Sequence, residues 1–456
     1  MLSVLRNRTY RRLFTAQAVA LVGTGLATVA LSLLAYDIAG NDASAVLGTA
    51  LAIKMTAYVA IAPFVGAVAD RIPRRTLMAT ADLLRAAVAA ALPFVTEVWE
   101  VYLLIFLLQA ASATFTPVFQ ATVPEVLPAE RDYTRALSMS RLAYDLESLF
   151  SPALAAALLT LVSYDWLFAG TTAGFAASAA LVLATVLPRP VPVERTAGAC
   201  AKAAFGVRLF RATPRLRALL ALDLAVAAAG AIVFVDTVVL VRDHFGRPAG
   251  AVSLALGAYG AGSLVTALLL PRLLRRVPDR ALMLPAAFAL PVVLAAVAVL
   301  TSTSPGTWSW TAVLLLWASI GAACSAVLTP GGRVIRRSTA DADLPAAFAA
   351  QFSLSHSCWL LTYPLAGWLA AGAGLAVTAL TLGAVSLTAA AAAAALWPAR
   401  DPSRLEHVHP DLPPDHPHLA GARPAAGGWR HGHHYVIDRY HHQWPSSGLT
   451  AVSRGR

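Results

Sequence analysis

Charged side chains are scarce in this chain, and lysine is nearly absent. Only 13% of the 456 residues are charged, and 58% are hydrophobic. Because a soluble domain carries about 25% charged residues, the composition excludes a water-soluble globule and predicts an all-α integral membrane protein. Arginine supplies 33 of the 35 basic residues, and the formal net charge is +11. In a soluble protein this excess would indicate nucleic acid, but in a membrane protein it anchors loops, so we expect no nucleic acid partner.

Three further absences narrow the class. The three cysteines, Cys200, Cys324 and Cys358, are far apart, which excludes a disulfide framework or a cysteine metal centre. No G-x-x-x-x-G-K-[ST] loop occurs in the chain, so nucleotide does not supply energy. We therefore expect a carrier driven by protons, not an enzyme, with no tightly bound cofactor. No cleavage site precedes the first apolar run, so no removable signal peptide is evident.

Long apolar runs make up most of the sequence. A membrane-spanning helix needs roughly 20 predominantly apolar residues. Twelve spans are predicted, at 13–36, 45–69, 76–95, 99–122, 136–162, 166–187, 216–241, 250–271, 281–301, 308–330, 346–370 and 373–397.

The distribution of basic residues supports this count. With a cytoplasmic N-terminus, the N-terminal segment and the even-numbered connections hold 23 Lys and Arg residues, counting Arg217 at the edge of a span. The odd-numbered connections hold only Arg242 and Arg247. Cytoplasmic loops carry this positive excess, so we predict that both termini lie in the cytoplasm. We expect the chain to be a monomer in a bacterial inner membrane.

The two halves of the chain resemble each other. "DRIPRRTLM" at 70–78 aligns with "RRVPDRALM" at 275–283, and both lie between the second and third spans of their half. Parallel six-helix repeats are typical of transporters. We therefore predict an N-terminal bundle (1–187), a cytoplasmic linker (188–215), a C-terminal bundle (216–397) and a disordered tail (398–456).

The loop "GAVADRIPRR" at 66–75 resembles the signature of the major facilitator superfamily, with Pro73 in place of its usual second glycine. In that family the loop latches the two halves together on the cytoplasmic side. Physically, an aspartate here can oppose a helix N-terminus, although the arginines can equally be simple membrane anchors. The matching residues are Gly66, Asp70, Arg71, Arg74 and Arg75.

Other segments resemble particular branches of this superfamily. "LFSPALAA" at 149–156 resembles a degraded Gly-Pro motif of proton-driven antiporters, and the N-terminal stretch resembles the branch of siderophore and drug exporters. Together with the histidine-rich tail, the chain is similar to nickel-resistance permeases of the NreB type. This resemblance implies export of Ni²⁺, or alternatively Co²⁺.

Ionisable residues inside the spans are costly and favour a functional interpretation. Arg141 and Asp145 lie four residues apart on one helical face, whereas Asp82 and Arg85 form a simple self-neutralising pair. His356 is the only histidine in a predicted span, and it can bind metal or carry a proton, although a lone buried histidine is more often structural. The candidates for the transport pathway or proton coupling are Lys54, Arg141, Asp145, Glu147, Asp236, His356 and Cys358.

Polar stripes follow the first and fourth spans, where the family resemblance places the central cavity. Gln17, Thr24 and Thr28 share one helical face, as do Gln109 and Thr116. These residues either line the cavity or bond between helices, which Ser, Thr and Gln commonly do.

Nine of the eleven histidines lie within residues 407–442, in H-x-H or H-H groups. Neutral imidazoles suit Ni, Cu, Zn and Co, whereas the Pro and Gly density of the tail opposes a folded domain. We expect several weak, flexible metal sites that collect cargo, the alternative being a histidine-rich composition without a role. These residues are His407, His409, His416, His418, His431, His433, His434, His441 and His442.

The sequence therefore predicts a twelve-helix secondary transporter that exchanges a small inorganic cation, Ni²⁺ or Co²⁺, for protons across the lipid bilayer. One alternative is an exporter of a siderophore, drug or other organic molecule, because few cation ligands lie in the spans. A second alternative is a metal sensor or buffer that the helices merely anchor.

Overall fold

The computed structural model describes most of the chain. The described residues are 2–68, 72–129, 132, 136, 139–140, 143, 147, 151, 154–187, 199–274, 276–340, 343–399, 404–409, 413, 416–419, 421–437, 441 and 444.

Long α-helices form most of the structure, because a backbone in lipid must satisfy its hydrogen bonds within the segment. The larger helices are α1 (Arg8–Ala39), α2 (Ala43–Val68), α3 (Arg74–Ala91), α4 (Val98–Val126), α6 (Asp165–Leu183), α7 (Ala199–Ala212), α8 (Pro214–Val239), α9 (Ala249–Leu273), α10 (Asp279–Ser302), α11 (Ser309–Leu328), α12 (Gly331–Ser338), α13 (Leu344–Ala373) and α14 (Leu375–Leu396). The π-helix η4 (Leu240–His244) extends α8, and the 3₁₀ helix η6 (Pro417–Leu419) lies in the tail.

Ten of the described helical segments are long and apolar enough to cross a membrane, so the chain is a multi-pass membrane protein. Each of the ten overlaps a predicted span. Of the 27 residues of the predicted fifth span, 136–162, 12 lie outside the described residues. The eleventh, 346–370, is the 30-residue helix α13, which carries a polar run at 351–358.

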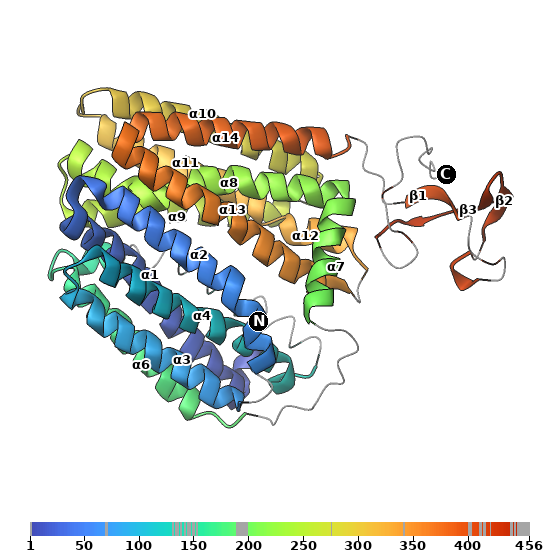
Figure 1. Ribbon diagram of the computed structural model, residues 1–456, viewed down its shortest axis with the longest axis horizontal. Helices are drawn as coiled ribbons and strands as arrows, with labels where there is room; N and C mark the ends of the chain where they lie inside the picture. Colours follow the sequence, from blue (N-terminus) through green and yellow to red (C-terminus); the bar gives the residue numbers. More distant parts are fainter. Residues whose placement is uncertain are drawn as a thin grey trace.

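The helices form two bundles, one from α1 to α6 and one from α8 to α14 (Figure 1). The sequence repeat is visible in the structure, because α3 and α10 both begin directly after a proline N-cap, at Pro73 and Pro278. The first helical residue is Arg74 in one half and Asp279 in the other. Arg74 pairs with Glu125 at 2.8 Å, and Asp279 pairs with Arg333 at 3.4 Å. Equivalent helix starts are thus held by ion pairs of opposite polarity.

Helix α7 lies within the predicted linker and packs on the C-terminal bundle. Gly206 brings it close to α13, because a Cβ atom there would lie 2.7 Å from the Ala350 Cβ and 2.8 Å from the Ala346 carbonyl oxygen. The described part of the linker is therefore a helix docked on the C-terminal half.

The predicted pair of Asp82 and Arg85 is confirmed as a buried ion pair inside the N-terminal bundle. The Ser178 hydroxyl donates a 2.6 Å hydrogen bond to the second Asp82 oxygen. The Arg85 guanidinium lies 4.6 Å from the Phe115 ring centroid and 4.5 Å from that of Phe175. These contacts offset the free-energy cost of removing the ion pair from water. The pair therefore has a structural role.

Replacing Asp82 with alanine is expected to destabilise the protein by about 3–5 kcal/mol, because the buried Arg85 charge loses its carboxylate. The double variant Asp82→Ala/Arg85→Met is expected to recover much of this loss, since replacing both ions removes the desolvation cost. Thermal unfolding in detergent measures both effects. Equal losses in the single and double variants would contradict a structural role for the pair.

The prediction of a disordered tail is wrong over its described residues. Strands β1 (Arg404–His409), β2 (Arg423–Ala425) and β3 (Gly428–His434) form an antiparallel sheet in the order β1-β3-β2. Gly427, with φ 87°, adopts the left-handed conformation that the tight turn between β2 and β3 requires. The proline and glycine residues thus form turns between short strands, which composition alone does not distinguish from disorder.

The tail contacts the C-terminal bundle near the start of α8. The Arg215 guanidinium lies 5.1 Å from the Trp444 ring centroid, and Trp444 lies 5.2 Å from the Tyr435 ring centroid. Tyr435 and Ile437 are buried in the same apolar cluster as the bundle helices. In Figure 1 the sheet lies beyond the end of the bundle where α7 and α12 are found.

Candidate functional site

The two bundles meet closely at the end opposite the chain termini. A Cβ atom at Gly48 in α2 would lie 2.6 Å from the Tyr363 carbonyl oxygen in α13. Next to this contact, the Trp368 indole donates a 3.2 Å hydrogen bond to the Thr49 hydroxyl. Nearby, the Tyr36 hydroxyl of α1 donates to Asp243 of η4. These contacts join the two halves at this end, which the charge distribution predicts to be extracellular.

Asp236 lies at the same end of the molecule, where the two bundles meet. It belongs to α8 of one half and lies beside Ser44 of α2 in the other, and both residues are fully buried. A buried carboxylate between two bundles becomes hydrated if the bundles separate, so its environment depends on the conformation.

Lys54, Glu147 and His356 come together near the middle of the bundles. The Lys54 ammonium interacts electrostatically with both the Glu147 carboxylate and the His356 ring. Glu147 approaches α1 at Gly25, where a Cβ atom would lie 3.1 Å from its Oε1. All three ionisable residues keep partial exposure, as expected for groups that border a water-filled path.

Aromatic rings surround this central group. Tyr58 lies 5.7 Å from the His356 ring centroid, and Phe352 lies 4.0 Å from it. The His356 Nδ1 is 2.7 Å from the Phe352 carbonyl oxygen, which constrains the ring. A second group, Phe234, Tyr259, Trp359 and Tyr363, continues toward the closed end.

Cys358 faces a different environment from His356, so the structure separates these two candidate ligands. Cys358 is buried near Asp223 of α8, and its Sγ is 3.5 Å from the Leu354 carbonyl oxygen. Asp223 in turn accepts a 2.7 Å hydrogen bond from Gln351. This polar group lies inside the C-terminal half.

The predicted latch is described in part. Gly66 is helical in α2, whereas Asp70 and Arg71 lie outside the described residues, as do Arg141 and Asp145. Arg74 pairs with Glu125 within its own half, and Arg75 is exposed at the start of α3.

The residues of the predicted cavity stripes differ in their bonding. Thr24 and Thr28 are half-buried, and each hydroxyl donates to the carbonyl four residues earlier in α1. Gln17 is buried and accepts a 3.2 Å hydrogen bond from Ser140, and Gln109 is buried in α4. The side chain of Thr116 lies outside the described part of the chain.

Six tail histidines converge in one place, which corrects the expectation of scattered, flexible sites. The ligand nitrogens of His407, His409, His418, His431 and His433 lie within 4.8 Å of one another, and His441 joins them through its Nε2, 3.0 Å from that of His407. We call these six residues the histidine cluster.

The strand pairing explains how the cluster forms. His407 in β1 pairs directly with His431 in β3. Because alternate residues of a strand share a face, His409 and His433 project on the same side as this pair. Each H-x-H group thus places two imidazoles on one face of the sheet, and η6 adds His418.

The spacing of the nitrogens matches metal coordination. The Nε2 atoms of His407 and His409 are 2.9 Å apart, and those of His418 and His441 are 3.3 Å apart. Two nitrogens that bind one ion at about 2.1 Å lie about 3.0 Å apart at a right angle and about 3.4 Å apart at a tetrahedral angle. The Nε2 of His431 is buried without a hydrogen-bond partner among the described residues. The cluster can therefore hold a transition-metal ion.

Two of the cluster histidines, His407 and His431, have the protonation state that metal binding needs. Burial, reinforced by neighbouring imidazoles, lowers the pKa of His407 to about 3 and that of His431 to about 4. Both rings are therefore neutral at pH 7, the form that binds metal ions.

His416, His434 and His442 differ from the six. His416 accepts a 3.2 Å hydrogen bond from the His418 backbone amide. The side chain of His434, and all of His442, lie outside the described residues.

The histidine cluster could have been predicted from the spacing of the histidines, although not from the composition of the tail. H-V-H at 407–409 and H-G-H at 431–433 have the period of two that a strand face requires, and Gly427–Gly428 is a turn signal between them. By contrast, no local pattern links Lys54 to Glu147 or Tyr36 to Asp243, because each pair comes from distant helices.

Two helical bundles with polar residues between them are typical of membrane transporters. A family model for the Major Facilitator Superfamily matches residues 13–319. The chain belongs to this superfamily of transporters.

Curated relatives include transporters of efflux type. An uncharacterised transporter of Bacillus subtilis, YfiS, is 27% identical over 216 residues, which cover 46% of this chain and 51% of YfiS. Macrolide efflux protein A of Streptococcus pyogenes is 28% identical over 151 residues, which cover 32% of this chain and 36% of that protein. The chain thus spans about half of these relatives' length or less.

Solved transporters share the fold. A bacterial homologue of the lysosomal transporter Spinster, in an inward-facing and occupied conformation, has a TM-score of 0.68 at 13% identity, covering 86% of this chain and 96% of that one. The nucleoside transporter NupG has a TM-score of 0.65 at 14% identity, covering 85% and 98%.

Proposed function

We propose that the chain exports a divalent transition-metal ion, Ni²⁺ first and Co²⁺ second, in exchange for protons. The observation that carries this proposal is the histidine cluster, in which the ligand nitrogens of five imidazoles lie within 4.8 Å of one another and a sixth joins them. Three pairs of Nε2 atoms in the cluster are 2.9 to 3.3 Å apart. Imidazole suits Ni, Co, Cu and Zn but not Mg or Ca. On the predicted topology the cluster lies in the cytoplasm, the side from which an exporter loads.

Within the bundles, the central group supplies a path for a cation. Glu147 and His356 carry ligand atoms of the types that bind divalent metals, and Lys54 interacts with both. An arriving cation would displace the Lys54 ammonium from Glu147, so binding of cargo would change this ion pair. Separation of the halves at Tyr36 and Gly48 would then release the cargo outward, and the latch at Asp70 would close the opposite end.

The second candidate function is efflux of an organic molecule. It is favoured by the similarity to macrolide efflux protein A over 151 residues and by the aromatic rings around His356. Aromatic walls bind apolar organic molecules well. The charged side chains of Lys54 and Glu147 are not expected in a path lined by aromatic rings alone, so they favour the metal over the organic molecule.

Growth under metal challenge tests the proposal. Cells that lack their own metal exporters would express the full chain, a chain ending at Pro398, or the variant Asp70→Asn, and be challenged with Ni, Co, Zn, Cu and Cd. We expect the full chain to raise Ni²⁺ tolerance and to lower accumulated Ni²⁺. The shortened chain is expected to retain part of this effect, since the tail concentrates cargo but does not form the path.

Two other outcomes would each contradict the proposed metal export. If the full chain raises tolerance to no metal but lowers accumulation of a macrolide, the organic function replaces the proposed one. If Asp70→Asn leaves Ni²⁺ tolerance unchanged while removal of the tail abolishes it, the chain acts as a metal buffer.

A further inference from the structure

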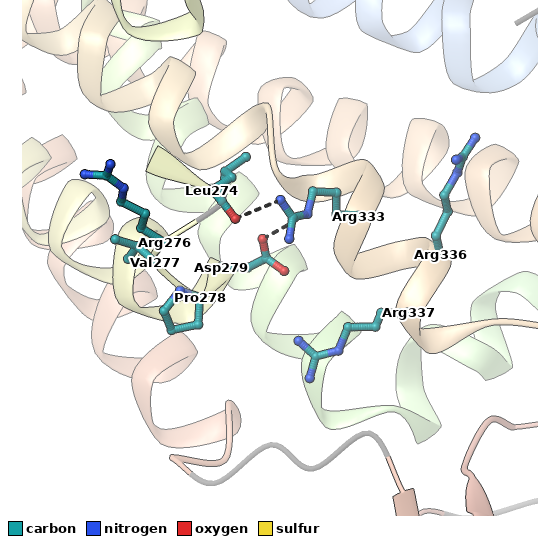
Figure 2. A pocket seen from close by; sticks show the side chains of 8 residues that line it. All are labelled: Leu274, Arg276, Val277, Pro278, Asp279, Arg333, Arg336 and Arg337. Carbon is teal, nitrogen blue, oxygen red and sulfur yellow. Dashed lines mark hydrogen bonds and ion pairs between the residues drawn. The ribbon is translucent and has the colours of Figure 1, made fainter. Parts of the chain in front are cut away.

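An arginine-lined cavity lies at the end of the C-terminal bundle that carries the linker and tail. It occupies about 650 Å³ between the end of α9, the start of α10 and α12. Arg276, Arg333, Arg336 and Arg337 line it, together with Asp279 (Figure 2). None of these residues belongs to the proposed metal path.

The cavity is electropositive. Four arginines against one aspartate leave a formal charge of +3 on its wall. Asp279 is buried and paired with Arg333, whose guanidinium also donates a 3.4 Å hydrogen bond to the Leu274 carbonyl oxygen. Figure 2 shows Arg333 turned toward these two partners, with Arg276 and Arg336 on opposite sides of the cavity. Among the residues that line the cavity, Asp279 is the single carboxylate and it pairs with Arg333, so arginines outnumber carboxylates in the lining.

The chemistry of the lining favours a phosphate group. Guanidinium groups bind phosphate oxygens through paired, charge-assisted hydrogen bonds. A phosphate alone fills only a small part of 650 Å³, so the space accommodates a larger molecule that carries one.

An apolar surface leads into the cavity from the lipid side. Val265, Leu268, Leu269 and Leu273 of α9 are 57%, 64%, 47% and 42% exposed. Their spacing of three to four residues places them on one face of the helix, and this face ends beside Leu274 at the cavity. An acyl chain can lie along this face while its headgroup occupies the cavity.

We propose that this cavity binds the headgroup of an anionic phospholipid. The basic wall holds the phosphate, and the exposed face of α9 accepts the acyl chain. Basic pockets between transmembrane helices on the cytoplasmic side recognise anionic lipids in this way. The site ties α9, α10 and α12 of the C-terminal half to the cytoplasmic leaflet.

Native mass spectrometry of the purified full chain tests this site. The probes are phosphatidylglycerol, phosphatidylcholine with the same acyl chains, and sn-glycerol 3-phosphate as a soluble phosphate. We expect phosphatidylglycerol to be retained most strongly. The variant Arg336→Gln/Arg337→Gln should weaken its retention about tenfold to thirtyfold, given the usual contribution of each basic residue.

Two further variants make the test specific. Arg272→Gln removes an exposed arginine of α9 that does not line the cavity, so it should leave retention within about twofold. Arg336→Gln alone changes an exposed side chain without threatening the fold and should weaken retention about threefold to fivefold. Unchanged retention in the double variant, or equal losses with Arg272→Gln, would overturn the proposal. Equal retention of sn-glycerol 3-phosphate would assign the cavity to a soluble phosphate compound and overturn the lipid.

Discussion

Replacing Gly48 with leucine is expected to abolish transport by preventing the two halves from closing at the predicted extracellular end. A Cβ atom there would lie 2.6 Å from the Tyr363 carbonyl oxygen, which is backbone and cannot rotate away. Overpacking of such a contact costs about 1–3 kcal/mol, so the ratio of closed to open molecules should fall about fivefold to 150-fold. A carrier that does not close on one side does not open on the other.

Cross-linking of cysteines at Tyr36 and Asp243 by a bifunctional thiol reagent reports this equilibrium, because the Tyr36 hydroxyl meets the Asp243 carboxylate when the end is closed. A reagent is needed because the length of the tyrosine side chain exceeds the reach of a direct disulfide. The measurement uses Tyr36→Cys/Asp243→Cys after replacement of the three native cysteines by serine. We expect rapid cross-linking with Gly48 and slow cross-linking with Gly48→Leu.

Gly372→Ala is the matched control, since it changes a glycine of α13 that has nothing within 4 Å of its Cβ position. It should leave cross-linking and transport unchanged. Loss of transport with unchanged cross-linking in Gly48→Leu would show that Gly48 acts on something other than closure.

The double variant His407→Ala/His431→Ala is expected to lower the affinity of the tail for Ni²⁺ by at least about 100-fold. These two residues pair directly across β1 and β3 and belong to the histidine cluster. Loss of residues that only support metal ligands costs about 10-fold to 100-fold, so loss of two ligands should cost at least as much. Equilibrium dialysis of the full chain measures the affinity.

His416→Ala serves as the control for this variant. His416 bonds to the His418 backbone but lies outside the set of five converging ligand nitrogens. Its replacement should change the affinity by about threefold or less. Similar losses in both variants would indicate scattered binding, as the composition of the tail first predicted, and would contradict a single assembled site.

The spans were predictable because the bilayer fixes the length and polarity of each helix. Ten described helices fall on predicted spans for this reason, and the helix starts at Arg74 and Asp279 follow from the repeated proline. Ion pairs between neighbours in sequence, such as Asp82 with Arg85, follow from helical spacing.

Contacts between the halves were not predictable in the same way. Lys54 and His356, or Gly48 and Tyr363, are separated by 302 and 315 positions, and their meeting depends on which end of the carrier is closed. The prediction of a disordered tail was wrong for another reason. Its Pro and Gly content is typical of disorder, whereas the strand period of its H-x-H groups is a local signal that composition does not contain.

The folded tail also sets an effective concentration. Only ten positions separate Trp397, at the end of the last helix, from His407 in the cluster. Such a segment reaches at most about 35 Å, so an ion bound in the cluster stays within a hemisphere of about that radius. One ion in this volume corresponds to an effective concentration on the order of 10 mM. If the proposed metal is the cargo, the cluster would present it to the mouth of the carrier at this effective concentration without first releasing it into bulk water.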